Sequence, residues 1–93
     1  MTITVTYRFT RDQTSVAGLR STQRVGTDAI NALEQWKAGG TMRDFEILDE
    51  EHETDEDDGA LIARLTTTQT DVDANRGMMD PLCNRYGVKR TVV

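Results

Sequence analysis

The sequence of 93 residues contains little cysteine, proline, histidine or aromatic residue, and these scarcities exclude several classes of protein. The single cysteine, Cys83, cannot form an intramolecular disulfide, whereas small secreted domains usually depend on several. One proline, with 37% hydrophobic and 29% charged residues, does not fit the biased composition of disordered chains. We therefore expect a folded cytoplasmic protein without a disulfide framework.

Long apolar runs are also missing. The longest uninterrupted apolar stretches, such as residues 60–63, are a few residues long, whereas a bilayer-spanning helix needs about 20. A signal peptide likewise needs a continuous apolar stretch. We therefore expect neither membrane insertion nor export. A chain of this length supports one core, so we predict a single domain over residues 1–93.

The formal net charge of −5 hides an uneven distribution of charge. Eight carboxylates lie within ten residues, and we call residues 49–58 the acidic segment. Its acidic residues are Asp49, Glu50, Glu51, Glu53, Asp55, Glu56, Asp57 and Asp58. The rest of the chain has more basic than acidic residues. This segment fits a patch that binds a basic protein surface, a mimic of nucleic-acid phosphates or a divalent-cation site. It equally fits a solvated hairpin tip that keeps the domain soluble.

Alternation of residue types predicts strands in the first half of the chain. Residues 2–10 place β-branched and aromatic residues at every second position, which predicts a strand. Its inner face would carry Ile3, Val5, Tyr7 and Phe9. Residues 11–26 give mixed signals and are predicted to be mostly loop. A helix is then predicted from Thr27, a suitable N-cap, to Gly39.

The second half of the chain predicts three more strands and a helix. Strands at residues 45–48 and 61–66 are separated by the turn signal Asp58-Gly59, which indicates a hairpin. A second helix is predicted after Thr70. A short last strand follows at residues 88–93, with Val88 and Val92 pointing inward.

The predicted order β-α-β-β-α-β is that of ferredoxin-like domains, an α+β fold. Right-handed crossovers predict a four-stranded antiparallel sheet with both helices on one face and the first and third strands in the centre. The other face would be open to solvent. It offers a second candidate interface, formed by Thr4, Thr6, Arg8, Ile62 and Arg64.

Signals for catalysis and metal binding are weak. The only histidine, His52, lies in the acidic segment, and nothing in the pattern brings it to Cys83 for nucleophilic catalysis. An EF-hand loop would need glycine where Asp58 stands. Tyr7 and Phe9 are predicted on the buried face, so the open face lacks the stacking aromatics of RNA-binding sheets. We expect no catalytic residue, no metal, no cofactor and no direct nucleic-acid binding.

Two main functional hypotheses follow from the sequence. In the first, the chain is a non-catalytic regulator or inhibitor whose acidic segment binds a basic protein surface as a nucleic-acid mimic. Small acidic inhibitors encoded by phages resemble it in size and charge. In the second, it is a homodimeric small-ligand-binding or structural module, and the acidic segment only keeps it soluble. A small enzyme that uses a cleft between helix and sheet is a third hypothesis.

Overall fold

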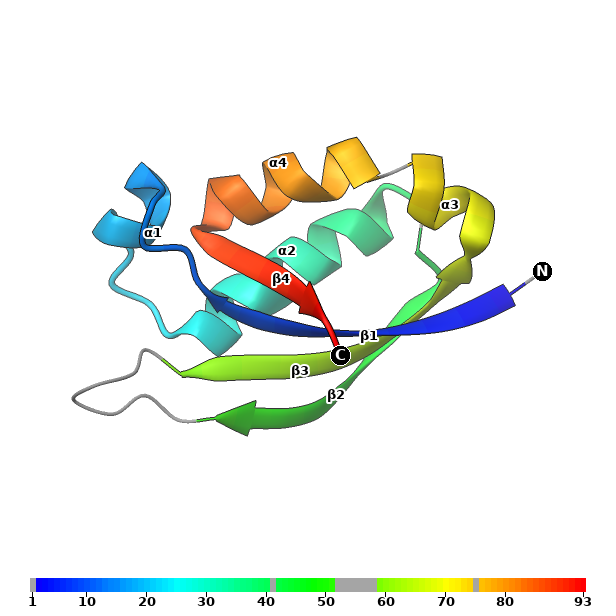
Figure 1. Ribbon diagram of the computed structural model, residues 1–93, viewed down its shortest axis with the longest axis horizontal. Helices are drawn as coiled ribbons and strands as arrows, with labels where there is room; N and C mark the ends of the chain where they lie inside the picture. Colours follow the sequence, from blue (N-terminus) through cyan, green and yellow to red (C-terminus); the bar gives the residue numbers. More distant parts are fainter. Residues whose placement is uncertain (1, 41, 52–58, 75) are drawn as a thin grey trace.

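The computed structural model describes residues 2–40, 42–51, 59–74 and 76–93 (Figure 1). Its strands are β1 (Thr2–Arg11), β2 (Asp44–Glu51), β3 (Ala60–Thr68) and β4 (Val88–Val92). Its helices are α1 (Val16–Arg20), α2 (Val25–Ala38), α3 (Gln69–Ala74) and α4 (Arg76–Tyr86). The four strands form one antiparallel sheet, which confirms the predicted α+β class.

The strands are arranged in the order β2-β3-β1-β4, so β1 and β3 are central and β2 and β4 form the two edges. The pairing of β2 with β3 contains a bulge between Ile47 and Asp49. Figure 1 shows the helices on one side of the sheet, which leaves the opposite face open. The open face and the two edges are therefore the parts of the sheet where other molecules can make contact.

The core lies between the sheet and α2. Alternation in β1 turns Tyr7 and Phe9 toward the helices, where both are buried with their ring centroids 6.1 Å apart. From β3, Leu61 and Leu65 are fully buried in the same cluster as Leu33 of α2. The inner face predicted for β1 is confirmed at Tyr7 and Phe9, because period-two alternation fixes which side chains share a face.

Helix α2 ends at Gly39 as predicted, and Gly40 follows with a φ of +80°. Its start differs from the prediction, because the N-cap position is Arg24 and not Thr27, and Arg24 makes no side-chain capping bond. The side chain of Glu50 instead lies against Gly26 in the first turn. A carboxylate there favours the helix through its dipole, which explains how α2 starts without a capping side chain.

The predicted loop at residues 11–26 is a further correction, because it contains α1 and the first residues of α2. The hydroxyl of Ser15 accepts a hydrogen bond of 2.9 Å from the N–H of Gly18 and so caps α1. A helix of five residues is not stable alone in water. It is held by packing at Gly18, whose backbone lies against Gly87 after α4.

The C-terminal part departs from the prediction in two smaller ways. The helical region comprises α3 and α4, and α4 continues through Pro81. Val92 has the register of an inner-face residue but is 70% exposed, because β4 is an edge strand. Val88, also predicted inward, is fully buried. None of the described helices has the length and apolar character needed to cross a membrane.

Candidate functional site

The acidic segment joins two neighbouring strands. Asp49, Glu50 and Glu51 are the last residues of β2, and Glu51 is paired with Ala60 at the start of β3. The remaining predicted binding carboxylates and the histidine lie outside the described residues: His52, Glu53, Asp55, Glu56, Asp57 and Asp58. The structure therefore gives the surroundings of the first three acidic residues only.

Two of these three carboxylates face cations of the same chain. Glu51 forms an ion pair of 2.7 Å with Arg8, and Glu50 lies 3.6 Å from Arg24. Asp49 is exposed and accepts a hydrogen bond from the N–H of Glu50. Of these three described carboxylates, two thus lie close to a described arginine and the third is exposed.

The residues of the second predicted interface lie together on the open face of the sheet. The sheet register pairs Thr4 with Thr66, Thr6 with Arg64, and Arg8 with Ile62, so all five predicted residues are neighbours. Arg64 forms an ion pair of 2.6 Å with Glu46 of β2. With the pair between Arg8 and Glu51, this makes the face polar. A polar face gives little hydrophobic driving force for face-to-face association.

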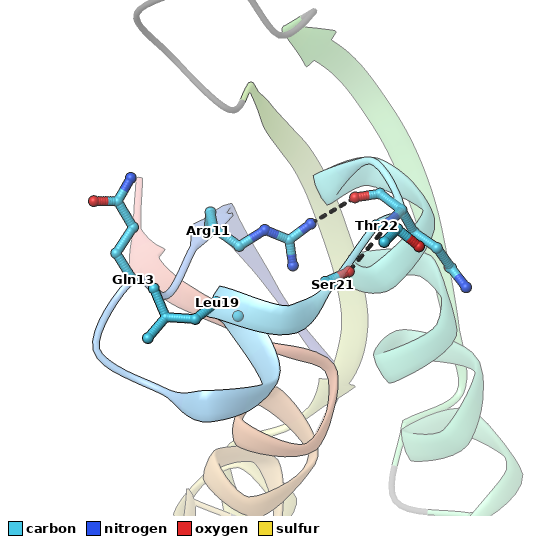
Figure 2. A pocket seen from close by; sticks show the side chains of 7 residues that line it. Arg11, Gln13, Leu19, Ser21 and Thr22 are labelled. Atoms are coloured by element: carbon cyan, nitrogen blue, oxygen red, sulfur yellow. Dashed lines mark hydrogen bonds between the residues drawn. The ribbon is translucent and has the colours of Figure 1, made fainter.

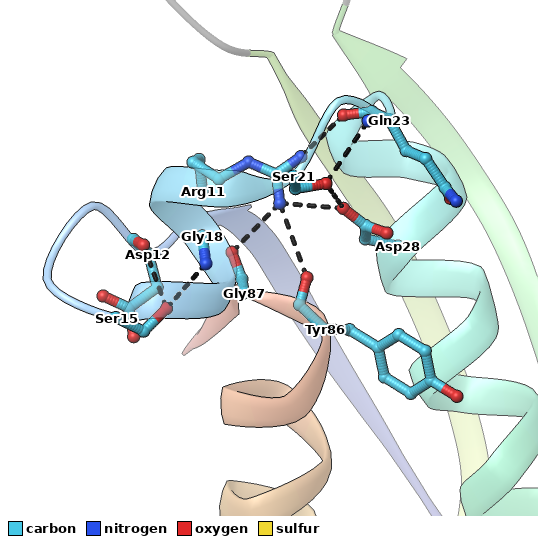
Figure 3. Close-up of polar contacts among 9 residues, drawn as sticks. All are labelled: Arg11, Asp12, Ser15, Gly18, Ser21, Gln23, Asp28, Tyr86 and Gly87. Carbon is cyan, nitrogen blue, oxygen red and sulfur yellow. Dashed lines mark hydrogen bonds and ion pairs between the residues drawn. The ribbon is translucent and has the colours of Figure 1, made fainter.

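A buried ion pair, which the sequence did not predict, lies at the opposite face of β1. Arg11 donates from Nη1 to Asp28 Oδ2 over 2.8 Å, and both side chains are only 7% exposed (Figure 3). Arg11 also donates to the carbonyl oxygens of Gln23, Tyr86 and Gly87, at 2.8, 3.4 and 3.2 Å. We call this group of contacts the Arg11 clamp.

The charged groups of the Arg11 clamp are complementary to the partial charges at two helix ends. Asp28 lies in the first turn of α2, and the carbonyls of Tyr86 and Gly87 lie at the end of α4. An anion at a helix start and a cation at a helix end are both favourable. Ser21 adds a hydrogen bond of 2.6 Å to the same carboxylate oxygen. The clamp therefore joins β1, the α1–α2 connection, α2 and α4.

A polar hollow of about 300 Å³ opens beside the Arg11 clamp (Figure 2). It is lined by Arg11, Gln13, Gly18, Leu19, Ser21, Thr22 and Gln23. The Ser21 hydroxyl donates directly to the Asp28 carboxylate, and no histidine lies among the lining residues. The lining residues therefore do not form a serine–histidine pair.

A second hollow, of about 310 Å³, is lined by Asp12, Cys83, Asn84, Val88, Lys89 and Arg90. Cys83 is 4% exposed and belongs to the core cluster, in agreement with the packing role typical of a free cysteine. Among the described residues, no group of three histidine, cysteine or acidic side chains is placed to hold a metal ion.

The half-buried Asp12 and the exposed Asp44 have lowered pKa values. The hydroxyl of Thr14 lowers the pKa of Asp12 below its ordinary value of 3.8, and the N–H of Thr14 adds to the effect. A hydrogen bond from Lys37 does the same for Asp44. Each interaction favours the folded state above the ordinary pKa. The contribution is lost as the pH falls through the lower value of the folded protein.

Removing the Thr14 hydroxyl tests the origin of the Asp12 shift. In the Thr14→Val variant, we expect the pKa of Asp12 to move toward 3.8, because the strongest hydrogen bond to the carboxylate is lost. NMR titration of the side-chain carboxyl carbon measures this pKa. The pKa of Asp44 is the internal control and should not change. An unchanged Asp12 titration would contradict the assignment.

A sequence signal for the Arg11 clamp was present but was not recognised. Arg11 continues the odd-numbered positions that carry Tyr7 and Phe9, so alternation placed a charged residue on the buried face of β1. A buried charge requires a partner, which alternation alone does not identify.

Comparisons of the chain with protein-family models, curated proteins and solved structures found no match.

Proposed function

We propose that this chain is a non-catalytic binding protein that engages a basic surface of another protein through the acidic segment. The observation that carries the proposal is the distribution of charge along the sequence. Eight of the 16 acidic residues lie within the ten residues of the acidic segment.

Outside the acidic segment, basic residues outnumber acidic ones. The sequence there has 11 basic and eight acidic residues. The excess negative charge is therefore concentrated in ten consecutive residues of the sequence. A basic groove that binds nucleic-acid phosphates gains affinity from the same kind of charge density, which supports a nucleic-acid mimic that inhibits or regulates its partner.

Neutralising the acidic segment tests this proposal. A variant with Asp55→Asn, Glu56→Gln, Asp57→Asn and Asp58→Asn should lose at least about ten-fold in affinity for its partner, because complementary charge speeds association and selects the partner. The partner is captured by the wild-type chain from an extract of the source organism and identified by mass spectrometry. Affinities of the purified proteins are then compared at two salt concentrations.

A matched variant controls for net charge. Glu34→Lys, Gln35→Lys and Ala38→Lys change three exposed positions of α2, and both variants have a net charge of −1. The control should bind the partner like the wild type if the position of the charge matters. Equal binding by the neutralised variant, or equal loss in both variants, would refute the proposal.

We also propose that the architecture is the ferredoxin-like one. The central position of β1 and β3 and the helices on one face of the sheet support this assignment (Figure 1). The additional helix α1 is an insertion between β1 and α2 on that assignment. An experimental structure in which β4 does not pair with β1 would contradict it.

A further inference from the structure

The two edges of the sheet carry most of the exposed large apolar side chains. Of the six such residues that the structure describes, Ile47 and Leu48 lie on β2, and Val92 and Val93 lie on β4 or directly after it. Their exposed fractions are 39%, 44%, 70% and 70%. An edge strand that keeps apolar side chains in water is suited to pairing with another strand.

The charges on the two edges are opposite. Strand β2 contains five acidic residues and no basic one, whereas β4 contains Lys89 and Arg90 and no acidic one. On the open face, β2 presents Glu46 and Asp49, and β4 presents Lys89. Cross-strand neighbours of opposite charge stabilise a sheet, and like charges destabilise it.

Strand directions permit the two edges to meet. Because β1 is antiparallel to both β3 and β4, and β2 is antiparallel to β3, β2 and β4 run in opposite directions. A second copy placed beside the first, with its helices on the same side, therefore brings its β4 antiparallel to β2. The antiparallel hydrogen-bonding pattern of the sheet would continue across the contact.

We propose that the acidic edge strand β2 of one molecule pairs with the basic edge strand β4 of a second copy of this chain. In this contact, Lys89 lies opposite the carboxylates of β2 on the open face. Val92 of one copy packs against Ile47 of the other on the helix-facing side of the sheet. Each molecule retains one unused edge, so the contact is head-to-tail and adds further copies instead of stopping at a dimer.

The same charges disfavour the symmetric alternatives. Pairing β2 with β2 would bring Glu46 and Asp49 of two copies together, and pairing β4 with β4 would do the same for Lys89. Like-charge contact at an interface disfavours association. This self-assembly goes beyond the proposed function, since it requires no other protein. It is tested with the purified chain alone.

Charge reversal on each edge tests the proposal. Lys89→Glu makes both edges acidic, and Asp49→Lys introduces a positive charge opposite the basic edge. Lys89 and Asp49 are exposed, so both variants should remain folded, as circular dichroism can verify. Sedimentation velocity at low salt over a wide concentration range should show species beyond the dimer for the wild type. Each variant alone should associate at least about ten-fold more weakly.

Mixing the two variants provides the decisive measurement. The acidic β4 of Lys89→Glu matches the altered β2 of Asp49→Lys, and the remaining edges have their original opposite charges. The mixture should therefore regain association, which neither variant shows alone. Glu34→Lys on α2 changes the net charge by the same amount as Asp49→Lys and should associate like the wild type. Amide hydrogen exchange should slow in β2 and β4 as concentration rises.

Three results would overturn the proposal. The wild-type chain could remain monomeric at every concentration, its association could stop at a dimer, or the mixed variants could fail to associate. None of these results bears on binding of the acidic segment to another protein, because no other protein is present. Loss of partner capture in the neutralised variant would likewise leave the edge contact intact.

Discussion

Replacing Arg11 with methionine is expected to lower the free energy of unfolding by about 3–5 kcal/mol. The change leaves the Asp28 carboxylate buried without a cation and removes the donor from three backbone carbonyls. Domains of this kind are stable by about 5–15 kcal/mol, so the variant should lose a large share of its stability. Urea unfolding followed by circular dichroism measures the effect.

An exposed ion pair of the same chemistry provides the matched control. Arg64 and Glu46 are 48% and 64% exposed, and Arg64→Met should cost less than about 1 kcal/mol because water solvates both charges. In addition, the effects of Arg11→Met and Asp28→Asn should be non-additive, since both break the same contact. Equal losses from Arg11→Met and Arg64→Met would show that the Arg11 clamp stabilises the fold no more than an exposed ion pair does.

Gly87→Ala is expected to have the second large effect, a loss of about 2–5 kcal/mol. Gly87 has a φ of +70°, which is unfavourable for alanine. An added Cβ would also overlap the backbone of Gly18 in α1 and the carbonyl carbon of Ala17. Backbone atoms cannot move aside as a flexible side chain can, so α1 would have to separate from the end of α4.

A variant at Gly40 separates the cost of the positive φ from the cost of the steric overlap. Gly40 has a φ of +80°, but an added Cβ would meet no atom of the described residues within 4 Å. Gly40→Ala should therefore cost only the conformational part, about 1–2 kcal/mol. The difference between the two variants in urea unfolding gives the contribution of the close approach between α1 and the end of α4. If both variants lose the same amount, that approach is not tight in solution.

Local sequence signals predicted the strands better than the connections between them. The alternation that buried Tyr7 and Phe9 is a property of neighbouring residues, and it appeared in the structure as expected. Helix α1 was missed because its stability depends on contact between Gly18 and Gly87, which lie far apart in the sequence. No local pattern reports such a contact.

For the candidate site as well, the sequence predicted some features and not others. The sequence identified the acidic segment and the residues that meet on the open face. It did not indicate that Glu50 would turn toward the start of α2 or that Glu51 would pair with Arg8, since both depend on strand register. The bulge between Ile47 and Asp49 shifts that register by one residue, which alternation in a single strand does not reveal.

The Arg11 clamp also has a consequence for the order of events when the protein is made. Its guanidinium lies in the first strand, but two of its carbonyl acceptors belong to Tyr86 and Gly87. The ribosome must therefore release the chain through Gly87 before this cation can reach its final neighbours. Nascent chains in which α4 has not yet emerged should remain sensitive to protease, and resistance should arise once it has.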